Sequence, residues 1–166
     1  MPMMVTVQAE TPLQDDVRRL IAALNEHLHP LSPPEFQFQM TVDEMADSDT
    51  TVFVARAASG AAVGCGALRI HGDGLGEVKR MYTVPEARGA GVGSSVLDAI
   101  IAEARANSLN WLMLETGAGA GFAGAWALYR RMGFTPRGPF LDYPDGEWSA
   151  YFELRLNGSR EAHLTS

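Results

Sequence analysis

Strand-like segments recur along the chain as short runs in which apolar residues alternate with polar ones or follow one another without a break. Alternation is typical of a half-buried strand, and an unbroken apolar run is typical of a strand covered on both faces. Two of the runs are separated by Ser59-Gly60, a dipeptide that favours a β-hairpin. The pattern predicts strands over residues 3–10, 50–58, 61–72, 74–84, 111–116 and 147–156.

Helical periodicity occupies the segments between these runs. Residues 11–28 begin with Thr-Pro, carry two acids in the first turn and repeat apolar side chains at helical spacing. Residues 94–109 carry a single apolar stripe, and residues 117–134 pass from a glycine-rich loop into a helix that stops at Gly133. The segment 36–49 is ambiguous between a loop and a short second helix.

With a further short strand between the last predicted helix and residues 147–156, the order is β-α(-α)-β-β-β-α-β-α-β-β, which predicts an α/β fold with a mixed, partly antiparallel sheet. No internal repeat and no linker divides the sequence. A chain of 166 residues is long enough for one domain that buries about two-thirds of its unfolded surface. We therefore expect a single domain over residues 1–156 and a polar, flexible C-terminal tail over 157–166.

Charge and cysteine content narrow the class of protein further. The net charge of −7, from 20 acidic and 13 basic residues, argues against a general nucleic-acid binder, which carries a basic surface. The lone Cys65 can form no intrachain disulfide, and its strand-like surroundings predict a small core residue. The sequence shows no signal peptide and no apolar run of ~20 residues, so we expect a cytoplasmic protein without nucleic-acid or membrane partners.

The stretch RGAGVGSS, residues 88–95, places a glycine-rich turn between a predicted strand and a predicted helix. Such a turn presents free backbone N–H groups and the positive end of the helix dipole to an anion. The spacing Gly89-x-Gly91-x-Gly93 matches neither the P-loop nor the dinucleotide-binding fingerprint. Spacing alone leaves a plain strand-to-helix connection open as the alternative interpretation.

Three segments together resemble the GNAT (Gcn5-related N-acetyltransferase) superfamily, and in particular its small bacterial acetyltransferases. VPEARGAGVG resembles the family's pyrophosphate loop, and GEVKRMYTVPEARG resembles the strand that pairs with the pantetheine arm of acetyl-CoA. ALYRRMGF, residues 127–134, resembles the family's Ala-x-x-Leu-Tyr-x-x-x-Gly-Phe segment. The resemblance spans residues 75–134 and implies the GNAT fold, a mixed central sheet of about seven strands flanked by about four helices.

The resemblance also implies how acetyl-CoA is bound as co-substrate. Tyr129 matches the family tyrosine that protonates the leaving thiolate, with a packing tyrosine as the alternative. Phe122 departs from the family, since many members carry a cofactor-contacting asparagine seven residues before that tyrosine. The implied cofactor-binding residues are Met81, Tyr82, Thr83, Arg88, Gly89, Ala90, Gly91, Val92, Gly93 and Ser94.

The strand before the glycine-rich turn also carries the candidate general base. Glu77 lies four residues before Met81, where several family members have a general-base glutamate. The alternative is a solvated glutamate that pairs with Lys79. Regular alternation would place four side chains on one face of this strand: Glu77, Lys79, Met81 and Thr83.

Four further residues are candidates for contacting the acceptor substrate. Lys79 and Arg80 are suited to binding a substrate carboxylate, with surface charges as the alternative. His29 ends the first predicted helix and Tyr143 lies in the loop before the last strand, two regions that border the acceptor pocket in GNAT enzymes. His71, in the turn HGDG, is expected to be solvated.

These features together predict an N-acetyltransferase that moves an acetyl group from acetyl-CoA to a primary amine of a small molecule or amino acid. The transfer is expected to be direct, without a metal ion. Two alternatives stay open: a protein N-terminal or lysine acetyltransferase of the same fold, and a non-catalytic acyl-CoA-binding sensor. The resemblance also implies a homodimer, because GNAT enzymes often pair through their C-terminal strands.

Overall fold

The computed structural model describes residues 3–156 of the chain, and the predicted tail over 157–166 lies outside the described residues. Its strands are β1 (Val5–Ala9), β2 (Thr50–Ala57), β3 (Ala62–Ile70), β4 (Leu75–Thr83), β5 (Trp111–Gly117), β6 (Thr135–Arg137) and β7 (Ser149–Arg155). Its α-helices are α1 (Asp15–Leu28), α2 (Val42–Met45), α3 (Val92–Ala106) and α4 (Ala123–Arg131). Single 3₁₀ turns lie at His29–Leu31, Pro34–Phe36, Pro85–Ala87 and Ala120–Phe122.

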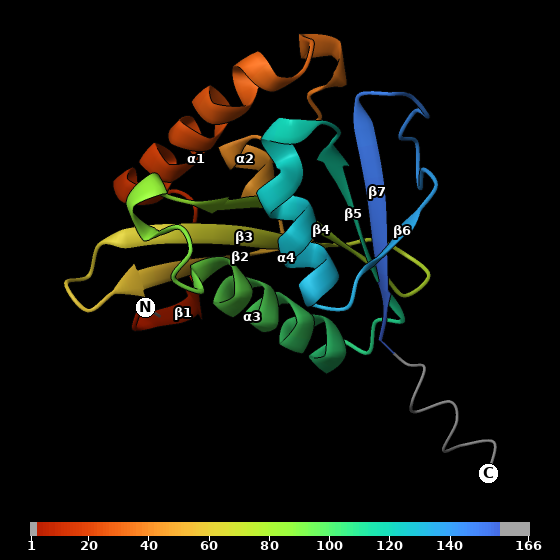
Figure 1. Ribbon diagram of the computed structural model, residues 1–166. Helices are drawn as coiled ribbons and strands as arrows, with labels where there is room; N and C mark the ends of the chain where they lie inside the picture. The colour runs from red at the N-terminus through yellow and green to blue at the C-terminus, as the bar shows by residue number, and fades with distance from the viewer. Residues whose placement is uncertain (1–2, 157–166) are drawn as a thin grey trace.

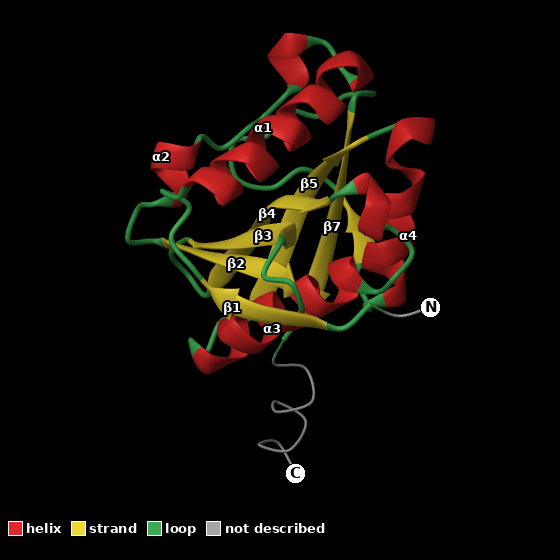
Figure 2. Ribbon diagram, turned by 90° about the vertical axis from the view of Figure 1, so that its left-hand side faces the viewer, coloured by secondary structure: helices red, strands yellow, loops and turns green. Residues whose placement is uncertain are grey.

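The strands form one sheet in the order β1-β2-β3-β4-β5-β7-β6 (Figure 1). The pair β4–β5 is parallel and the other neighbouring strands are antiparallel. Helices α1 and α2 cover one face, and α3 and α4 cover the other, as the turned view also shows (Figure 2). The predicted α/β fold, with a mixed sheet of seven strands and four α-helices, is therefore confirmed for the described residues.

The helix boundaries follow local turn chemistry. Helix α3 begins two residues earlier than predicted, because Gly91 takes the left-handed conformation, with φ 86°, and serves as its N-cap. Helix α1 begins at Asp15, since the preceding residues form a turn in which Thr11 Oγ1 accepts the N–H of Leu13. The ambiguous segment 36–49 contains α2, which Thr41 caps in a reciprocal capping box with Glu44.

Each face of the sheet has its own apolar core. The α1 side buries four side chains of that helix against β2, β3 and Cys65, which is fully buried as predicted. The α3 side buries a larger set of apolar side chains, which includes Leu97, Ile100 and Phe152. At about 25 cal/mol per Å² of apolar surface, burial on both faces is what holds the two helical layers to the sheet.

Strand β4 separates from β5 after a short parallel segment. Only three residue pairs join the two strands, with Leu75–Glu77 opposite Trp111–Met113. Beyond Glu77, the outer edge of β4 pairs with no other strand in the part of the chain described. The two strands therefore leave a gap in the middle of the sheet, with backbone N–H and C=O groups of β4 along one side.

A β-bulge at Arg80 changes which side chains share a face of β4. Lys79 pairs with Ala67 and Tyr82 with Cys65, so two residues of β4 oppose one of β3, and Arg80 has φ 57°. The prediction that Glu77, Lys79, Met81 and Thr83 lie on one face is therefore wrong. Lys79 and Tyr82 lie on the α1 side, whereas the side chains of Met81 and Thr83 lie beside those of Val96 and Val92 in α3.

Candidate functional site

A cavity of about 800 Å³ opens where β4 and β5 separate. Its lining comes from the C-terminal half of α1, residues 36–39, the outer parts of β4 and β5, the turn at 88–94, α4 and Tyr143. Segments far apart in the sequence therefore meet at one place in the fold. The volume is in the range of ~300–1,000 Å³ usual for small-molecule sites.

The glycine-rich turn leads along one end of the cavity into the N-terminus of α3. Gly89 and Gly91 both have positive φ, 78° and 86°, and no side chain caps the helix. The Ser95 N–H donates to the Gly91 carbonyl at 3.1 Å, so the N–H groups before it are those that an α-helix leaves without internal partners. Free donors and the positive end of a 15-residue helix fit a pyrophosphate.

Nine of the ten predicted cofactor-binding residues line the cavity, and Ala90 does not. The Ala90 carbonyl instead accepts the N–H of Met3 at 3.0 Å. The side chain of Arg88 donates from Nε to the Thr83 carbonyl at 3.0 Å and lies over the Tyr82 ring, 5.7 Å from its centroid. These contacts fix Arg88 at the junction of β4 and the turn, where its charge adds to that of the helix end.

Glu77 lies in a buried cluster of polar side chains. It is 2% exposed, and its Oε1 lies 2.9 Å from His71 Nε2. Its Oε2 accepts hydrogen bonds from Tyr143 Oη and, at 3.3 Å, from Lys79 Nζ. His71 is therefore not the solvated turn residue that we expected, and Glu77 pairs with Lys79 but is not solvated.

Tyr143 reaches this cluster from the loop between β6 and β7. Its hydroxyl accepts from Lys79 Nζ at 2.9 Å while donating to Glu77. Its ring packs edge-on against Phe38, with 5.2 Å between the ring centroids. Burial and the charge of Glu77 hold the pKa of Tyr143 above its usual range, so the phenol stays protonated. Three of the predicted site residues, Glu77, Lys79 and Tyr143, are thus in mutual contact.

Glu115 of β5 also lines the cavity, and the sequence analysis did not select it. Ser149 Oγ donates to its Oε2 at 2.7 Å, the one hydrogen bond that the Glu115 carboxylate makes within the described residues. Burial raises the pKa of Glu115 to about 6. A single carboxylate in the otherwise apolar run WLMLET is the sequence signal that would have found it.

The raised pKa of Glu115 leads to a prediction about stability. Folding favours the protonated form, so the ionised side chain destabilises the folded state above pH 6, and this effect disappears as the pH falls below the carboxyl's ordinary range. We expect E115Q to raise the free energy of unfolding by about 1–2 kcal/mol at pH 8 and to change it little at pH 4. Urea unfolding at the two pH values measures both numbers, and a loss of stability at pH 8 would contradict the burial argument.

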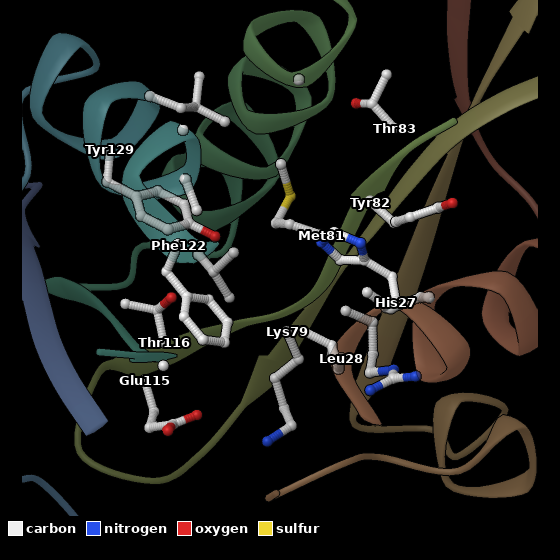
Figure 3. A pocket seen from close by; sticks show the side chains of 18 of the residues that line it. His27, Leu28, Lys79, Met81, Tyr82, Thr83, Glu115, Thr116, Phe122 and Tyr129 are labelled. Carbon is white, nitrogen blue, oxygen red and sulfur yellow. The ribbon is translucent and has the colours of Figure 1, made fainter. Parts of the chain in front are cut away.

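Tyr129 of α4 faces Met81 across the cavity. Its ring packs against Phe134 and Phe152, with centroids 5.8 and 6.0 Å away. Figure 3 shows its hydroxyl pointing away from α4 into the cavity. Burial, and then the charge of Glu115, hold the pKa of Tyr129 above its usual range, so it is a proton donor throughout neutral pH. Phe122 lines the same wall at the position where the family pattern has asparagine.

Arg80 lines the α1 side of the cavity and is 8% exposed. Its Nη2 donates to Asn25 Oδ1, and its Nε has no hydrogen-bond partner. His29, by contrast, is not among the residues that line the cavity, because the chain turns at His29–Leu31 and leaves it exposed. His27, two residues earlier, lines the cavity instead, so the cavity lining does not support His29 as an acceptor contact.

Two further features were sought among residues 3–156. No group of three or more His, Cys, Asp or Glu side chains in that range is arranged to hold a metal ion. None of the helices described there is both long and apolar enough to cross a membrane.

Comparisons with known proteins agree with this fold. The family model described as "Acetyltransferase (GNAT) domain" matches residues 48–136. An IAA acetyltransferase of Azospirillum brasilense is 44% identical over 153 residues, which are 92% of this chain and 98% of that protein. The solved structure of a Klebsiella pneumoniae protein assigned as an acyl-CoA N-acyltransferase is similar with TM-score 0.77 and 32% identity, covering 92% of this chain and 98% of that one.

A Thermoplasma acidophilum N-acetyltransferase, solved in complex with coenzyme A, has the same fold with TM-score 0.71 and 14% identity, over 92% of this chain and 99% of that one. The family match covers more than half of the sequence, and the resemblance seen in its motifs is confirmed. This chain therefore belongs to the GNAT acetyltransferase family and is an acyltransferase.

Proposed function

We propose that this protein transfers an acetyl group from acetyl-CoA directly to a primary amine of a small molecule or amino acid. The observation that carries the proposal is one cavity lined by the N-terminus of a long helix, which is suited to an anion, and by two carboxylates, Glu77 and Glu115. The donor is supported by the turn at 88–94, and by the coenzyme A bound to a protein of the same fold. The IAA acetyltransferase relative supports a small-molecule acceptor.

The residues at the cavity divide into a donor side and an acceptor side. Backbone N–H groups of the turn would hold the pyrophosphate, and the unpaired edge of β4 around Met81 would hold the pantetheine amides as an added strand does. Acetyl-CoA supplies an activated acyl group when bound. The protein's part is to hold the amine beside the thioester and to move two protons.

Two carboxylates are candidates for taking the proton from the amine. Glu77, the residue favoured by the sequence, already accepts hydrogen bonds from Tyr143 and Lys79 and contacts His71. The carboxylate of Glu115 has one hydrogen bond within the described residues and a pKa of about 6, so it is ionised and available at pH 7.5. We therefore assign the base role to Glu115 and give Glu77 the role of holding Lys79 and Tyr143 in place.

Tyr129 is the proposed proton donor to the leaving thiolate. Removing its hydroxyl in Y129F is expected to lower kcat about 10²-fold, at the low end of the range for loss of a general acid. The aromatic ring and its packing against Phe134 and Phe152 stay, so the melting temperature should change little. Steady-state kinetics beside thermal unfolding checks both, and an unchanged kcat would assign Tyr129 to packing alone.

The proposed function is tested by thiol release from acetyl-CoA over a panel of amines. The panel contains amino acids, small amines, peptides with a free N-terminus and peptides with an internal lysine. We expect release with small amines. Release with peptides alone would make this a protein acetyltransferase, and acetyl-CoA binding without release for any amine would favour the sensor. Cys65 should add no background in the native enzyme, because it is fully buried and burial raises its pKa to about 12.

A further inference from the structure

We propose that the acceptor amine carries a carboxylate, and that Arg80 is the residue that binds it. The inference rests on the proposed function and narrows its acceptor to one chemical class. It begins from a buried guanidinium that has no counter-ion within the described residues, beside the cavity where the acceptor must lie.

Arg80 differs from the arginines that form ion pairs in the described part of the chain. Arg56, Arg69 and Arg137 pair with carboxylates at 2.7–3.2 Å, although all three side chains are 24–37% exposed. Arg80 is 8% exposed, and its one hydrogen-bond acceptor from a side chain is the neutral amide of Asn25. Its Nε is the single buried side-chain N or O atom without a hydrogen bond in the described part of the chain.

Such a charge is costly to bury. Removing an ion from water without a counter-charge is strongly unfavourable, and one amide oxygen offsets only part of that cost. The same burial holds the pKa of Arg80 below its usual range. A ligand carboxylate would supply the missing counter-charge and can accept two N–H groups of a guanidinium at once.

The backbone at Arg80 is also held in an unusual conformation. Its φ of 57° lies in the left-handed region that a non-glycine residue rarely adopts. The bulge directs the side chain toward Asn25 of α1, on the face of the sheet opposite α3. The pyrophosphate turn lies at the N-terminus of α3, so the anion at Arg80 is expected to belong to the acceptor and not to the donor.

Lys79, the other cation predicted to contact the acceptor, is already neutralised. Its Nζ lies 3.3 Å from Glu77 Oε2 and 2.9 Å from Tyr143 Oη. Of the two adjacent cations in β4, only Arg80 therefore keeps an unbalanced charge. Apolar side chains surround the same part of the cavity and fit an apolar substrate body: Leu24, Leu28, Phe36 and Phe38.

Matched acceptor pairs test the inference. Each pair is an amino acid and the amine that remains when its carboxylate is removed: phenylalanine with phenethylamine, tryptophan with tryptamine, and leucine with isopentylamine. We expect wild-type kcat/KM, corrected for the fraction of neutral amine, to be at least ~10-fold higher for the member with the carboxylate. R80M should lose this preference, because its kcat/KM should fall for the amino acid and stay the same for the amine without a carboxylate.

Two controls separate a binding role from a structural one. R105M removes an exposed arginine of α3 and should keep the wild-type preference. R80M should bind acetyl-CoA as tightly as wild type and melt no lower, because it removes a buried unpaired charge. If Arg80 has only a structural role, R80M should melt at a lower temperature and lose kcat/KM equally on both members of each pair.

The remaining outcomes are also decisive. Equal or faster reaction of the amines without a carboxylate, or an unchanged preference in R80M, would overturn the assignment of Arg80. If peptides react but neither member of any amino acid–amine pair does, both the assignment of Arg80 and the proposal of a small-molecule acceptor are overturned. If acetyl-CoA binds and no amine of any class releases CoA, the proposed function itself fails.

Discussion

Replacing Gly91 with valine is expected to weaken acetyl-CoA binding about 10³-fold while the protein stays folded. Gly91 has φ 86° and caps α3, and nothing in the protein lies within 4 Å of the position a Cβ would take. A β-branched side chain opposes that conformation and occupies the space through which the pyrophosphate reaches the N–H groups. Loss of two charge-assisted hydrogen bonds at about 1.5–3 kcal/mol each accounts for a loss of this size. Titration calorimetry with acetyl-CoA measures it.

Gly60 provides a matched control for this substitution. It lies in the turn between β2 and β3 with φ 91°, and its Cβ position is also open. G60V therefore introduces a similar backbone strain, and Gly60 is not among the residues that line the cavity. We expect G60V and G91V to lose similar amounts of stability, and only G91V to lose affinity for acetyl-CoA. Equal affinities in the two variants would show that the turn does not hold the donor.

Replacing Glu115 with glutamine is expected to lower kcat/KM about 10³-fold at pH 7.5, since an amide accepts no proton. The pH profile gives a sharper test. As the pH falls, protonation of the amine alone lowers log kcat/KM with a slope of about 1 per pH unit. Protonation of a general base adds a second slope of about 1. In the wild type the second slope should begin near pH 6, the pKa of Glu115, and in E115Q it should be absent.

E77Q distinguishes the two carboxylates. It keeps the size of the side chain but weakens the contacts with His71, Lys79 and Tyr143. We expect a rise in KM for the amine and a lower melting temperature, with the slope near pH 6 retained. If E77Q removes that slope and E115Q does not, Glu77 is the base, as the sequence alone predicted.

The donor side of the site was more predictable from sequence than the acceptor side. The turn at 88–94 and Tyr129 are local motifs, in which consecutive residues define both the shape and the chemistry. The strand before the turn and the helix after it formed close to where the periodicity placed them, with α3 beginning two residues early. Predictions from local motifs of this kind hold in the folded structure because they do not depend on distant segments.

The acceptor side depends on contacts between distant segments and on one irregularity. Strand alternation cannot anticipate the bulge at Arg80, which arises from pairing with β3 and reverses the faces of Met81 and Thr83. The contact of Tyr143 with Glu77 spans 66 residues, and that of Ser149 with Glu115 spans 34. His29 does not line the cavity, since a turn begins at this residue, and helical spacing alone could not anticipate that turn.

Two expectations are not tested by the fold. The homodimer and the absence of a metal requirement stay predictions, and gel filtration and metal analysis of active enzyme would address them. Neither changes the division of the cavity into a donor side and an acceptor side.

Direct acetyl transfer to an amine is tested most directly by following the acetyl group itself. The enzyme is incubated with acetyl-CoA labelled with ¹³C in the acetyl group and with the best amine of the panel, and every species is examined by mass spectrometry. We expect one labelled N-acetyl product for each CoA released, and an enzyme of unchanged mass. Label on the enzyme, or CoA release without a labelled amine, would contradict direct transfer.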